Sequence, residues 1–361
     1  MPKPKLSLIL GAGFSCEASL PSTAQLSEQF ISISTTDTAH PAIEQEITER
    51  LTAFWQDVFF YRNPAVKPAL EDHFTAIDLA ANSGHHLGTD YGPRKLRAIR
   101  RFSIHRAFQI LDMRYRSSDP IRTILSRLNE TTELSVVSVN WDIVVENHFR
   151  ELGIAYHYGS TVKSLGNPSQ DTAGVPLLKL HGSANWVYCD SCRTLFSSPP
   201  SAGKAALHQG TFLEPEDFQI FDSPQYVVDA VRTLDRSHDV CHLCGCRMTA
   251  RVGTFSYRKD YAIQQFQTIW HEAFDSLRES AAWLFIGYSM PEADFEFKQI
   301  LKSAELTNQR KGELRKLVVL LRDSLAAKRY KRFFGLTSAQ VSQRGLSGFT
   351  KNGFDRLLKR L

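Results

Sequence analysis

The sequence predicts an α/β fold, in which a Rossmann-like parallel sheet carries a helical insertion and a small zinc-ribbon module. Three observations lead to this prediction. Short runs rich in Val, Ile and Leu are continuously apolar, as expected for parallel strands that helices cover on both faces. Apolar residues recur at helical spacing between the first two runs, and two CxxC pairs follow the third. The apolar runs are residues 6–10, 134–139, 175–180, 282–286 and 317–321.

Length and composition are those of an ordinary globular protein. The 361 residues allow one large domain with insertions or two domains. The 43 basic residues barely outnumber the 38 acidic ones, which permits nucleic-acid contact without requiring it. No apolar run is long enough for a transmembrane helix, and the run at residues 6–10 is too short for a signal peptide. With six cysteines, most of them in CxxC pairs, we expect a soluble, cytoplasmic protein.

The order of these elements predicts three structural parts. Residues 1–30, 131–188 and 251–361 form the Rossmann-like domain, and residues 189–250 form the zinc-binding module. Residues 31–130 are too long for a simple crossover between strands, and their apolar residues have helical spacing, so we expect a helical insertion subdomain.

The first four predicted strands each end in a polar or glycine-containing turn. In open α/β sheets the ligand crevice lies outside the carboxyl ends of the strands, so the turns should converge on one site. Histidine is well suited to accept a proton near neutral pH, although His181 could also be a hydrogen-bonded core residue. Asn140 and Asp142 could also cap the helix that follows them. The four turns are residues 11–13, 140–142, 181–182 and 287–289.

Gly11-Ala12-Gly13 follows the first strand and precedes a helix. Glycines at this point allow a close approach of the backbone to a pyrophosphate, or simply a tight strand-to-helix turn. The third glycine of the usual dinucleotide fingerprint is missing. We interpret Cys16 in the same loop as a structural thiol, because no base is adjacent to it in the sequence.

Two CxxC pairs predict a four-cysteine zinc site. A closed set of four thiolates leaves no open coordination position, so the metal should be structural. Cys246, or less readily His242, could replace one ligand. The predicted ligands are Cys189, Cys192, Cys241 and Cys244.

Taken together, these motifs resemble a sirtuin catalytic domain. Gly-Ala-Gly-x-Ser (11–15), Asn-x-Asp (140–142), Lys-Leu-His-Gly (179–182), the CxxC pairs and Gly-x-Ser (287–289) occur in the family's order over most of the chain. The forms Asn-Trp-Asp, His-Gly-Ser-Ala-Asn-Trp and Phe-Ile-Gly-Tyr-Ser-Met-Pro-Glu-Ala-Asp are more similar to bacterial sirtuin-like proteins of anti-phage defence than to protein deacetylases.

The resemblance implies that NAD binds between the Rossmann-like domain and the zinc module. It implies catalytic roles for Asn140 and Asp142 beside the nicotinamide ribose and carboxamide, and for His181 at the ribose hydroxyls. Cleavage of the N-glycosidic bond builds positive charge on the ribose, so it needs an oriented acceptor and a base. The implied cofactor-binding residues are Gly11, Ala12, Gly13, Phe14, Ser15, Asn140, Asp142, Gly287, Tyr288 and Ser289.

Departures from the deacetylase pattern favour water as the acceptor. Leu20-Pro21 stands near the position of the deacetylases' Asp-Phe-Arg segment, and Val139 replaces the glutamine before the asparagine. Residues 254–261 do not resemble the strand that pairs with an acyl-lysine peptide. We therefore expect an NAD⁺ hydrolase that forms ADP-ribose and nicotinamide, rather than a deacylase.

The same resemblance suggests an anti-phage effector gated by homo-oligomerisation or by a partner such as a helicase-type ATPase. An alternative is a sensor or assembly subunit that binds NAD or ADP-ribose without turnover. A nucleic-acid-directed subunit is a third and weaker possibility, because residues 94–106 contain six Lys or Arg residues, but the favoured interpretation of this segment is a solvated helix face. No membrane partner is expected.

Overall fold

The core of the protein is a seven-stranded, all-parallel sheet with the order β11-β10-β9-β1-β2-β5-β3. The computed structural model describes residues 2–32, 39–63, 67–82, 87–165, 173–199, 213–234, 240–250, 263–310, 316–337, 340–346 and 348. The five predicted apolar runs form the five central strands, each within one residue of its predicted bounds. The strands are β1 (Lys5–Leu10), β2 (Glu133–Ser138), β3 (Tyr156–His157), β5 (Val175–Lys179), β9 (Ala282–Ile286), β10 (Lys316–Leu320) and β11 (Val341–Ser342).

Burial on both faces explains why the central strands read as continuous apolar runs. In β1, Leu8 and its register partners Val136 of β2 and Leu284 of β9 are all 0% exposed. The edge strands β3 and β11 have two residues each, which is too short for a recognisable pattern.

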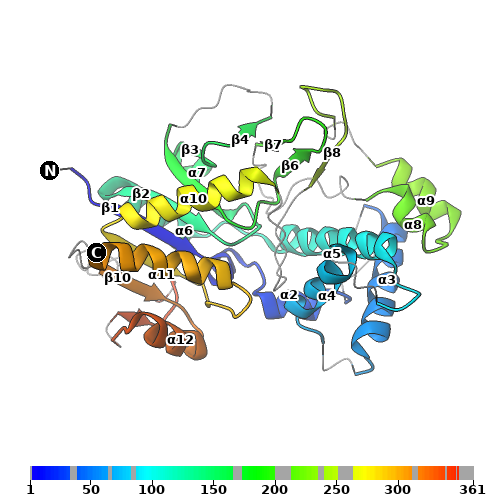
Figure 1. Ribbon diagram of the computed structural model, residues 1–361, viewed down its shortest axis with the longest axis horizontal. Coiled ribbons are helices and arrows are strands. Elements are labelled where there is room, and N and C mark those ends of the chain that lie inside the picture. The colour runs from blue at the N-terminus through cyan, green and yellow to red at the C-terminus, as the bar shows by residue number, and fades with distance from the viewer. Residues whose placement is uncertain are drawn as a thin grey trace.

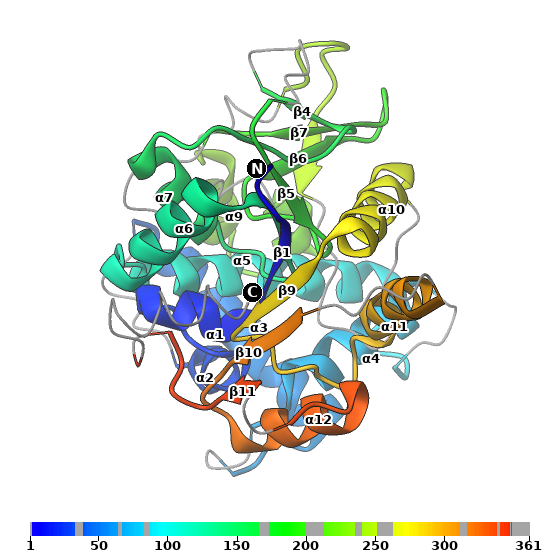
Figure 2. The same cartoon turned by 90° about the vertical axis from the view of Figure 1, so that its left-hand side faces the viewer.

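Helices cover the two faces of the sheet, as Figure 2 shows. One layer contains α6 (Asp119–Thr131) and α7 (Val144–Leu152), and the opposite layer contains α10 (Gln264–Glu279) and α11 (Phe295–Arg310). A further helix, α12 (Ser324–Phe334), follows β10. Each covering helix has an apolar side that faces the strands; in α6 it is formed by Ile121, Ile124, Leu125 and Leu128.

A second group of helices lies at the end of the molecule opposite the N-terminus of β1 (Figure 1). The long helix α5 is buried without interruption from Phe102 to Leu111, because helices pack on it from several sides. A cluster of aromatic rings around the buried His73 forms part of this layer. Its members are α2 (Thr23–Gln29), α3 (Pro41–Phe59), α4 (Leu70–Asn82) and α5 (Pro93–Arg114).

Two short helices from the segment 189–250 join this helical layer. Helix α8 (Pro215–Gln219) places Phe218 4.9 Å from Phe102 of α5, measured between ring centroids. Helix α9 (Gln225–Arg232) packs on α3. The segment expected to form the zinc module therefore also contributes to the helical layer, because its apolar helix faces need a larger core than the small sheet offers.

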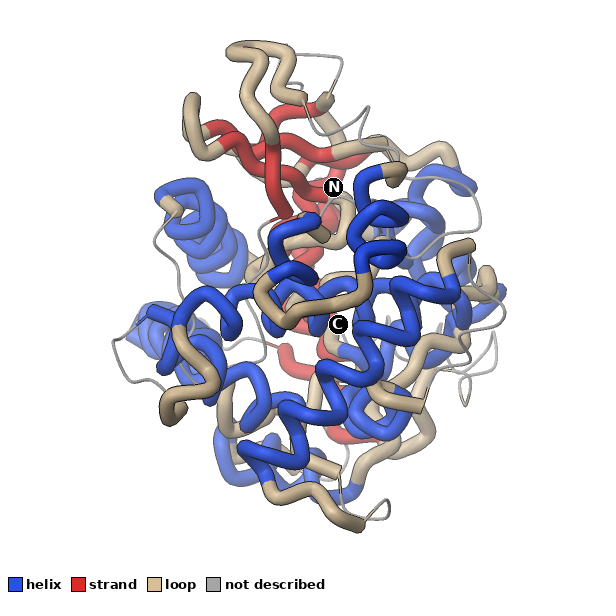
Figure 3. Tube along the Cα trace, turned by 90° about the vertical axis from the view of Figure 1, so that its right-hand side faces the viewer, coloured by secondary structure: helices blue, strands red, loops and turns tan. Residues whose placement is uncertain are grey.

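The rest of the segment 189–250 contributes strands to a four-stranded sheet with the order β4-β7-β6-β8. Figure 3 shows these strands gathered at one end of the molecule. No helix in the described part of the chain is both long and apolar enough to span a membrane. The strands are β4 (Val162–Ser164), β6 (Trp186–Cys189), β7 (Thr194–Ser197) and β8 (Met248–Ala250).

Candidate active site

The turns after β1, β2, β5 and β9 meet at one cavity of about 1390 Å³. These strands are neighbours in the sheet, and the strand order reverses at β1, which is where open α/β sheets usually bind ligands. Of the predicted site residues, the cavity is lined by Ala12, Gly13, Asn140, His181, Gly287, Tyr288 and Ser289. The remaining four, Gly11, Phe14, Ser15 and Asp142, are not among the lining residues.

The glycines of the first turn have a packing role that is visible in the structure. The amide of Gly13 donates to the carbonyl oxygen of Gly287 at 2.9 Å. A Cβ at Gly13 would lie 2.8 Å from Cα of Gly287, and a Cβ at Gly287 would lie 2.1 Å from the nitrogen of Phe14. Gly287 also has a φ of +65°, a left-handed conformation that glycine adopts readily. These glycines therefore let the two turns pack against each other.

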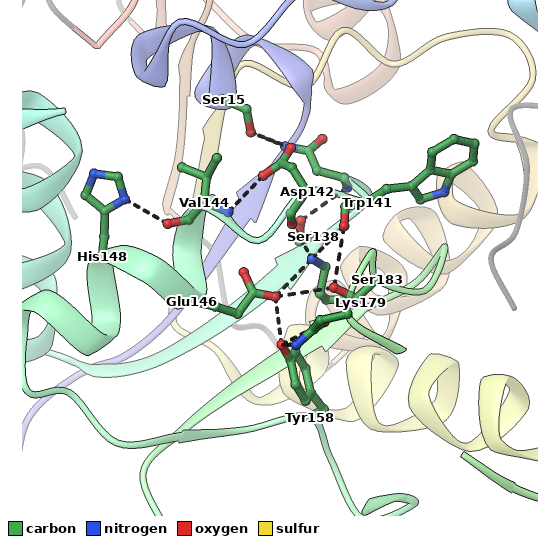
Figure 4. Close-up of polar contacts among 12 residues, drawn as sticks. Ser15, Ser138, Trp141, Asp142, Val144, Glu146, His148, Tyr158, Lys179 and Ser183 are labelled. Atoms are coloured by element: carbon green, nitrogen blue, oxygen red, sulfur yellow. Dashed lines mark hydrogen bonds and ion pairs between the residues drawn. The ribbon is translucent and has the colours of Figure 1, made fainter. Parts of the chain in front are cut away.

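Ser15 links the first turn to the second (Figure 4). The side-chain nitrogen of Asn140 donates to Oγ of Ser15 at 3.0 Å, and this hydroxyl donates to Oδ2 of Asp142 at 2.8 Å. The other carboxylate oxygen of Asp142 accepts from the backbone nitrogen of Val144 at 3.1 Å, in the first turn of α7. Asp142 thus holds the start of the helix and, through Ser15, the amide of Asn140.

Burial raises the pKa of the Asp142 carboxyl, because the charged form loses solvation. The positive charge of Lys179 and the hydrogen bond from Ser15 act in the opposite direction. The two neighbours therefore offset part of the effect of burial, and the pKa of this carboxyl behind the cavity wall stays raised.

A buried ion pair supports the turn that carries Asn140 and Asp142. Nζ of Lys179 lies 3.0 Å from Oε1 of Glu146 and also donates to the backbone carbonyls of Trp141 and Asp142. The hydroxyl of Tyr158 donates to the same Glu146 oxygen at 2.9 Å (Figure 4). We did not predict a role for Lys179 from the sequence, although a lysine within an apolar strand is a recognisable signal of a buried partner.

His181 is 3% exposed, and its position is set by contacts on both sides of the ring. Its Nδ1 lies 3.2 Å from the carbonyl oxygen of Val139, so Nδ1 is the protonated nitrogen in the neutral ring. Nε2 lies 3.7 Å from Oδ1 of Asp294. The negative charge of this carboxylate would stabilise the imidazolium that forms once Nε2 accepts a proton. The hydroxyl of Tyr288 donates to the other Asp294 oxygen at 3.2 Å.

Asp294 lines the cavity, and we did not predict a role for it from the sequence. It is the last residue of the segment Gly-Tyr-Ser-Met-Pro-Glu-Ala-Asp. From the sequence, this segment was recognised only as one of the motifs that resemble sirtuin-like proteins. The turn that follows β9 brings this carboxylate to His181, more than 100 residues away in the sequence.

The four predicted cysteine ligands lie together, with all their sulfur atoms within 4.8 Å of one another. The Sγ atoms of Cys189 and Cys244 are 3.4 Å apart, and those of Cys192 and Cys241 are 3.7 Å apart. A tetrahedral zinc ion with bonds of about 2.3 Å would separate its sulfur ligands by roughly 3.8 Å, so this donor set fits zinc. None of the four lines the cavity, which suits a structural metal.

The basic segment 94–106 lies on α5, where half of its cationic side chains are used within the fold. Arg100 pairs with Asp78 at 3.0 Å, and Arg101 pairs with Asp217 of α8. Arg106 is 0% exposed and donates to backbone carbonyls and to Glu44. Three of the six cations are therefore held by residues that pack on α5, whereas Arg94 and Arg97 are exposed, as expected for a solvated helix face.

Neither the protein-family models nor the curated proteins match this sequence. Among solved structures, one of Sir2 enzymes is similar at a TM-score of 0.44 and 14% identity, covering 99% of this chain and 92% of that one. A Sir2 variant with a p53 peptide and NAD has a TM-score of 0.44 at 12% identity, covering 98% and 93%. A Sir2 homologue in complex with NAD has a TM-score of 0.40 at 15% identity, covering 98% and 88%.

Proposed function

We propose that this protein is an NAD⁺ glycohydrolase that cleaves NAD⁺ to ADP-ribose and nicotinamide. One observation carries the proposal: Asn140 and His181, from adjacent strands, line the same cavity at the point where the strand order reverses. The ordered motif series that resembles sirtuins supports NAD as the substrate. The cavity, at about 1390 Å³, is also large enough for a dinucleotide.

The residue types suit the bond that has to break. In the proposed step, the oxygen of water forms a bond to C1′ of the ribose, the bond from C1′ to the nicotinamide nitrogen breaks, and one proton is released. Asn140 has its amide nitrogen held by Ser15, which leaves its amide oxygen to orient the water. His181 accepts the proton at Nε2, and the carboxylate of Asp294 stabilises the resulting imidazolium.

Two apolar side chains support hydrolysis over deacylation. Leu20 and Val139 both line the cavity, near the positions where the deacetylase pattern has polar or charged residues. Residues 254–261, which do not resemble the acyl-peptide strand, lie outside the described residues. Water as acceptor needs no peptide-binding strand.

The resemblance also motivates the biological setting that we propose: an anti-phage effector whose NAD⁺ cleavage is gated by self-association or by a helicase-type ATPase. An unrestrained NAD⁺ hydrolase would deplete the cofactor of its own cell. In this proposal the cysteine cluster holds a structural zinc ion, and the catalytic step does not involve it.

The test is nicotinamide release from NAD⁺ by the purified protein, alone and with the products of neighbouring genes, quantified by liquid chromatography. Asn140→Ala and His181→Ala should each lower turnover at least about 100-fold, as expected for loss of an orienting group or a general base. The matched controls Asn129→Ala and His271→Ala change residues outside the cavity and should retain turnover.

Three results would contradict the proposal. Unchanged turnover in His181→Ala would exclude that residue as the base. Tight binding of ADP-ribose with no nicotinamide under any activating condition would favour the sensor function. NAD⁺ consumption that depends strictly on an acetyl-lysine peptide would identify a deacylase.

A further inference from the structure

Among the described residues, the charged side chains that line the cavity leave one cation available for a ligand. Three lining residues are basic: Lys67, Arg114 and Arg322. The guanidinium of Arg322 pairs with Glu17 at 2.7 Å, and the ammonium of Lys67 donates to the backbone carbonyl of Glu28. Arg114 makes no hydrogen bond or ion pair with any residue of the described chain.

The cavity also contains more acidic than basic side chains. Its lining includes the carboxylates of Glu28, Glu71, Asp294 and Asp323. A dinucleotide diphosphate carries two negative charges, so entry into this lining is unfavourable without a cation directed at it. The guanidinium of Arg114, which has no partner among the described residues, is the group that can supply this charge.

The backbone places Arg114 beside the first turn. It is the last residue of α5, and the chain leaves the helix at Tyr115. The next amide, that of Arg116, donates to the carbonyl oxygen of Ala18 at 2.9 Å. Ala18 ends the short 3₁₀ helix η1 (Cys16–Ala18), which directly follows α1 (Ala12–Ser15). This hydrogen bond anchors the chain after α5 to η1, and Ala12 and Gly13 of the glycine turn line the same cavity as Arg114.

The glycine turn has no charged side chain and cannot neutralise a diphosphate. The presence of glycine at position 13 is explained by packing against the turn after β9, because a Cβ at Gly13 would collide with Gly287. The helix dipole stabilises a guanidinium at the C-terminal end of a helix. This effect would be the same on any side of the helix end, so it does not explain why Arg114 lies on the cavity wall. A guanidinium can also bind two phosphate oxygens at once, which makes arginine well suited to a diphosphate.

We propose that Arg114 binds the diphosphate of the dinucleotide and so selects a diphosphate-linked ligand over a nucleoside. This inference rests on the proposed NAD⁺-binding function. It assigns a binding role to a residue of the helical insertion, which the motif series does not include. Arg114 is exposed in the described structure, so its replacement should leave the fold intact.

Isothermal titration calorimetry measures the affinity of the protein for ADP-ribose, which contains the diphosphate, and for adenosine, which does not. Comparing the two affinities separates binding of the diphosphate from binding of the nucleoside. Arg114→Ala should weaken ADP-ribose binding by roughly 10- to 100-fold, the effect of losing a hydrogen bond between charged groups, and leave adenosine binding unchanged. Arg114→Lys should restore part of the affinity. The control Arg116→Ala removes a neighbouring guanidinium that donates to the Tyr115 carbonyl and does not line the cavity, so it should bind like the wild type.

Two results would overturn the assignment while the proposed function stands: Arg114→Ala binds ADP-ribose as tightly as the wild type, or it loses ADP-ribose and adenosine to the same degree. If the wild-type protein binds neither ADP-ribose nor NAD⁺, the assignment and the proposed function both fail. Thermal unfolding of each variant, with midpoints matching the wild type, confirms that the comparison is made between folded proteins.

Discussion

Replacing Lys179 with methionine removes the cation from a polar cluster with almost no access to solvent. The side chains of Lys179 and Glu146 are 1% and 0% exposed, and their charged atoms lie 3.0 Å apart. Loss of one partner leaves the other charge buried without a counter-ion, which costs about 3–5 kcal/mol. The carbonyls of Trp141 and Asp142 also lose a donor. We expect Lys179→Met to lower the free energy of unfolding by about 3–5 kcal/mol, a large share of the 5–15 kcal/mol typical of a folded protein.

Urea unfolding followed by tryptophan fluorescence measures this loss. Adding Glu146→Leu to the Lys179→Met variant removes the uncompensated carboxylate, so the double variant should be more stable than Lys179→Met by about 2 kcal/mol or more. The matched control is Lys316→Met, which removes an exposed lysine at the start of β10 and should change stability by no more than about 0.5 kcal/mol.

Two outcomes would refute this reasoning. A loss of less than about 1 kcal/mol in Lys179→Met would mean that the pair does not behave as a buried ion pair. A double variant no more stable than Lys179→Met would mean that the cost comes from the backbone carbonyls or from packing, and not from the isolated charge of Glu146.

Three other substitutions test separate parts of the structure. Gly287→Ala should destabilise the protein by about 2 kcal/mol or more in urea unfolding, whereas Gly153→Ala, at a similar positive φ with open space around it, should cost only about 1 kcal/mol; equal losses would contradict a role for the contact between the two turns. Cys192→Ser should lower the zinc content measured by mass spectrometry, and Cys246→Ser, outside the four-sulfur cluster, should retain it. Because burial raises the pKa of Asp142, its ionisation costs stability as the pH rises through that pKa. The stability of the wild type relative to Asp142→Asn, which does not ionise, should therefore fall between pH 4 and pH 7 in urea unfolding, and a relative stability that stays constant or rises over this range would contradict this.

Much of the scaffold could be predicted from the sequence because it depends on local patterns. Strands that are buried on both faces must be apolar throughout, so the central strands were visible as uninterrupted runs. Parallel strands bring their carboxyl ends to one edge, so Asn140 and His181 could be expected at the same cavity from the sequence alone. Cysteine spacing similarly predicted the sulfur cluster, because two CxxC pairs are typical of a tetrahedral metal site.

Other features depended on contacts between distant segments. Asp294 reaches His181, and Lys179 reaches Glu146, only because the chain folds back over many residues. The basic residues of α5 suggested a solvated face, and Arg94 and Arg97 are exposed. The sequence did not show that α4 and α8 supply carboxylates to Arg100 and Arg101. Sequence periodicity reports which side of an element is apolar, and it contains no information about which element will cover that side.

The sequence by itself therefore determined the α/β class, the central strands, the turns that meet at the cavity and the four clustered cysteines, because hydrophobic periodicity and ligand spacing are local properties. Only the tertiary structure decided which polar groups act together: the hydrogen bonds from Asn140 to Ser15 and from Ser15 to Asp142, the Asp294 carboxylate beside His181, and Arg114 on the cavity wall with no partner among the described residues. Hydrogen bonds and ion pairs require atoms to lie within a few ångströms of each other, and for residues far apart in the chain that distance is set by the packing of the whole fold.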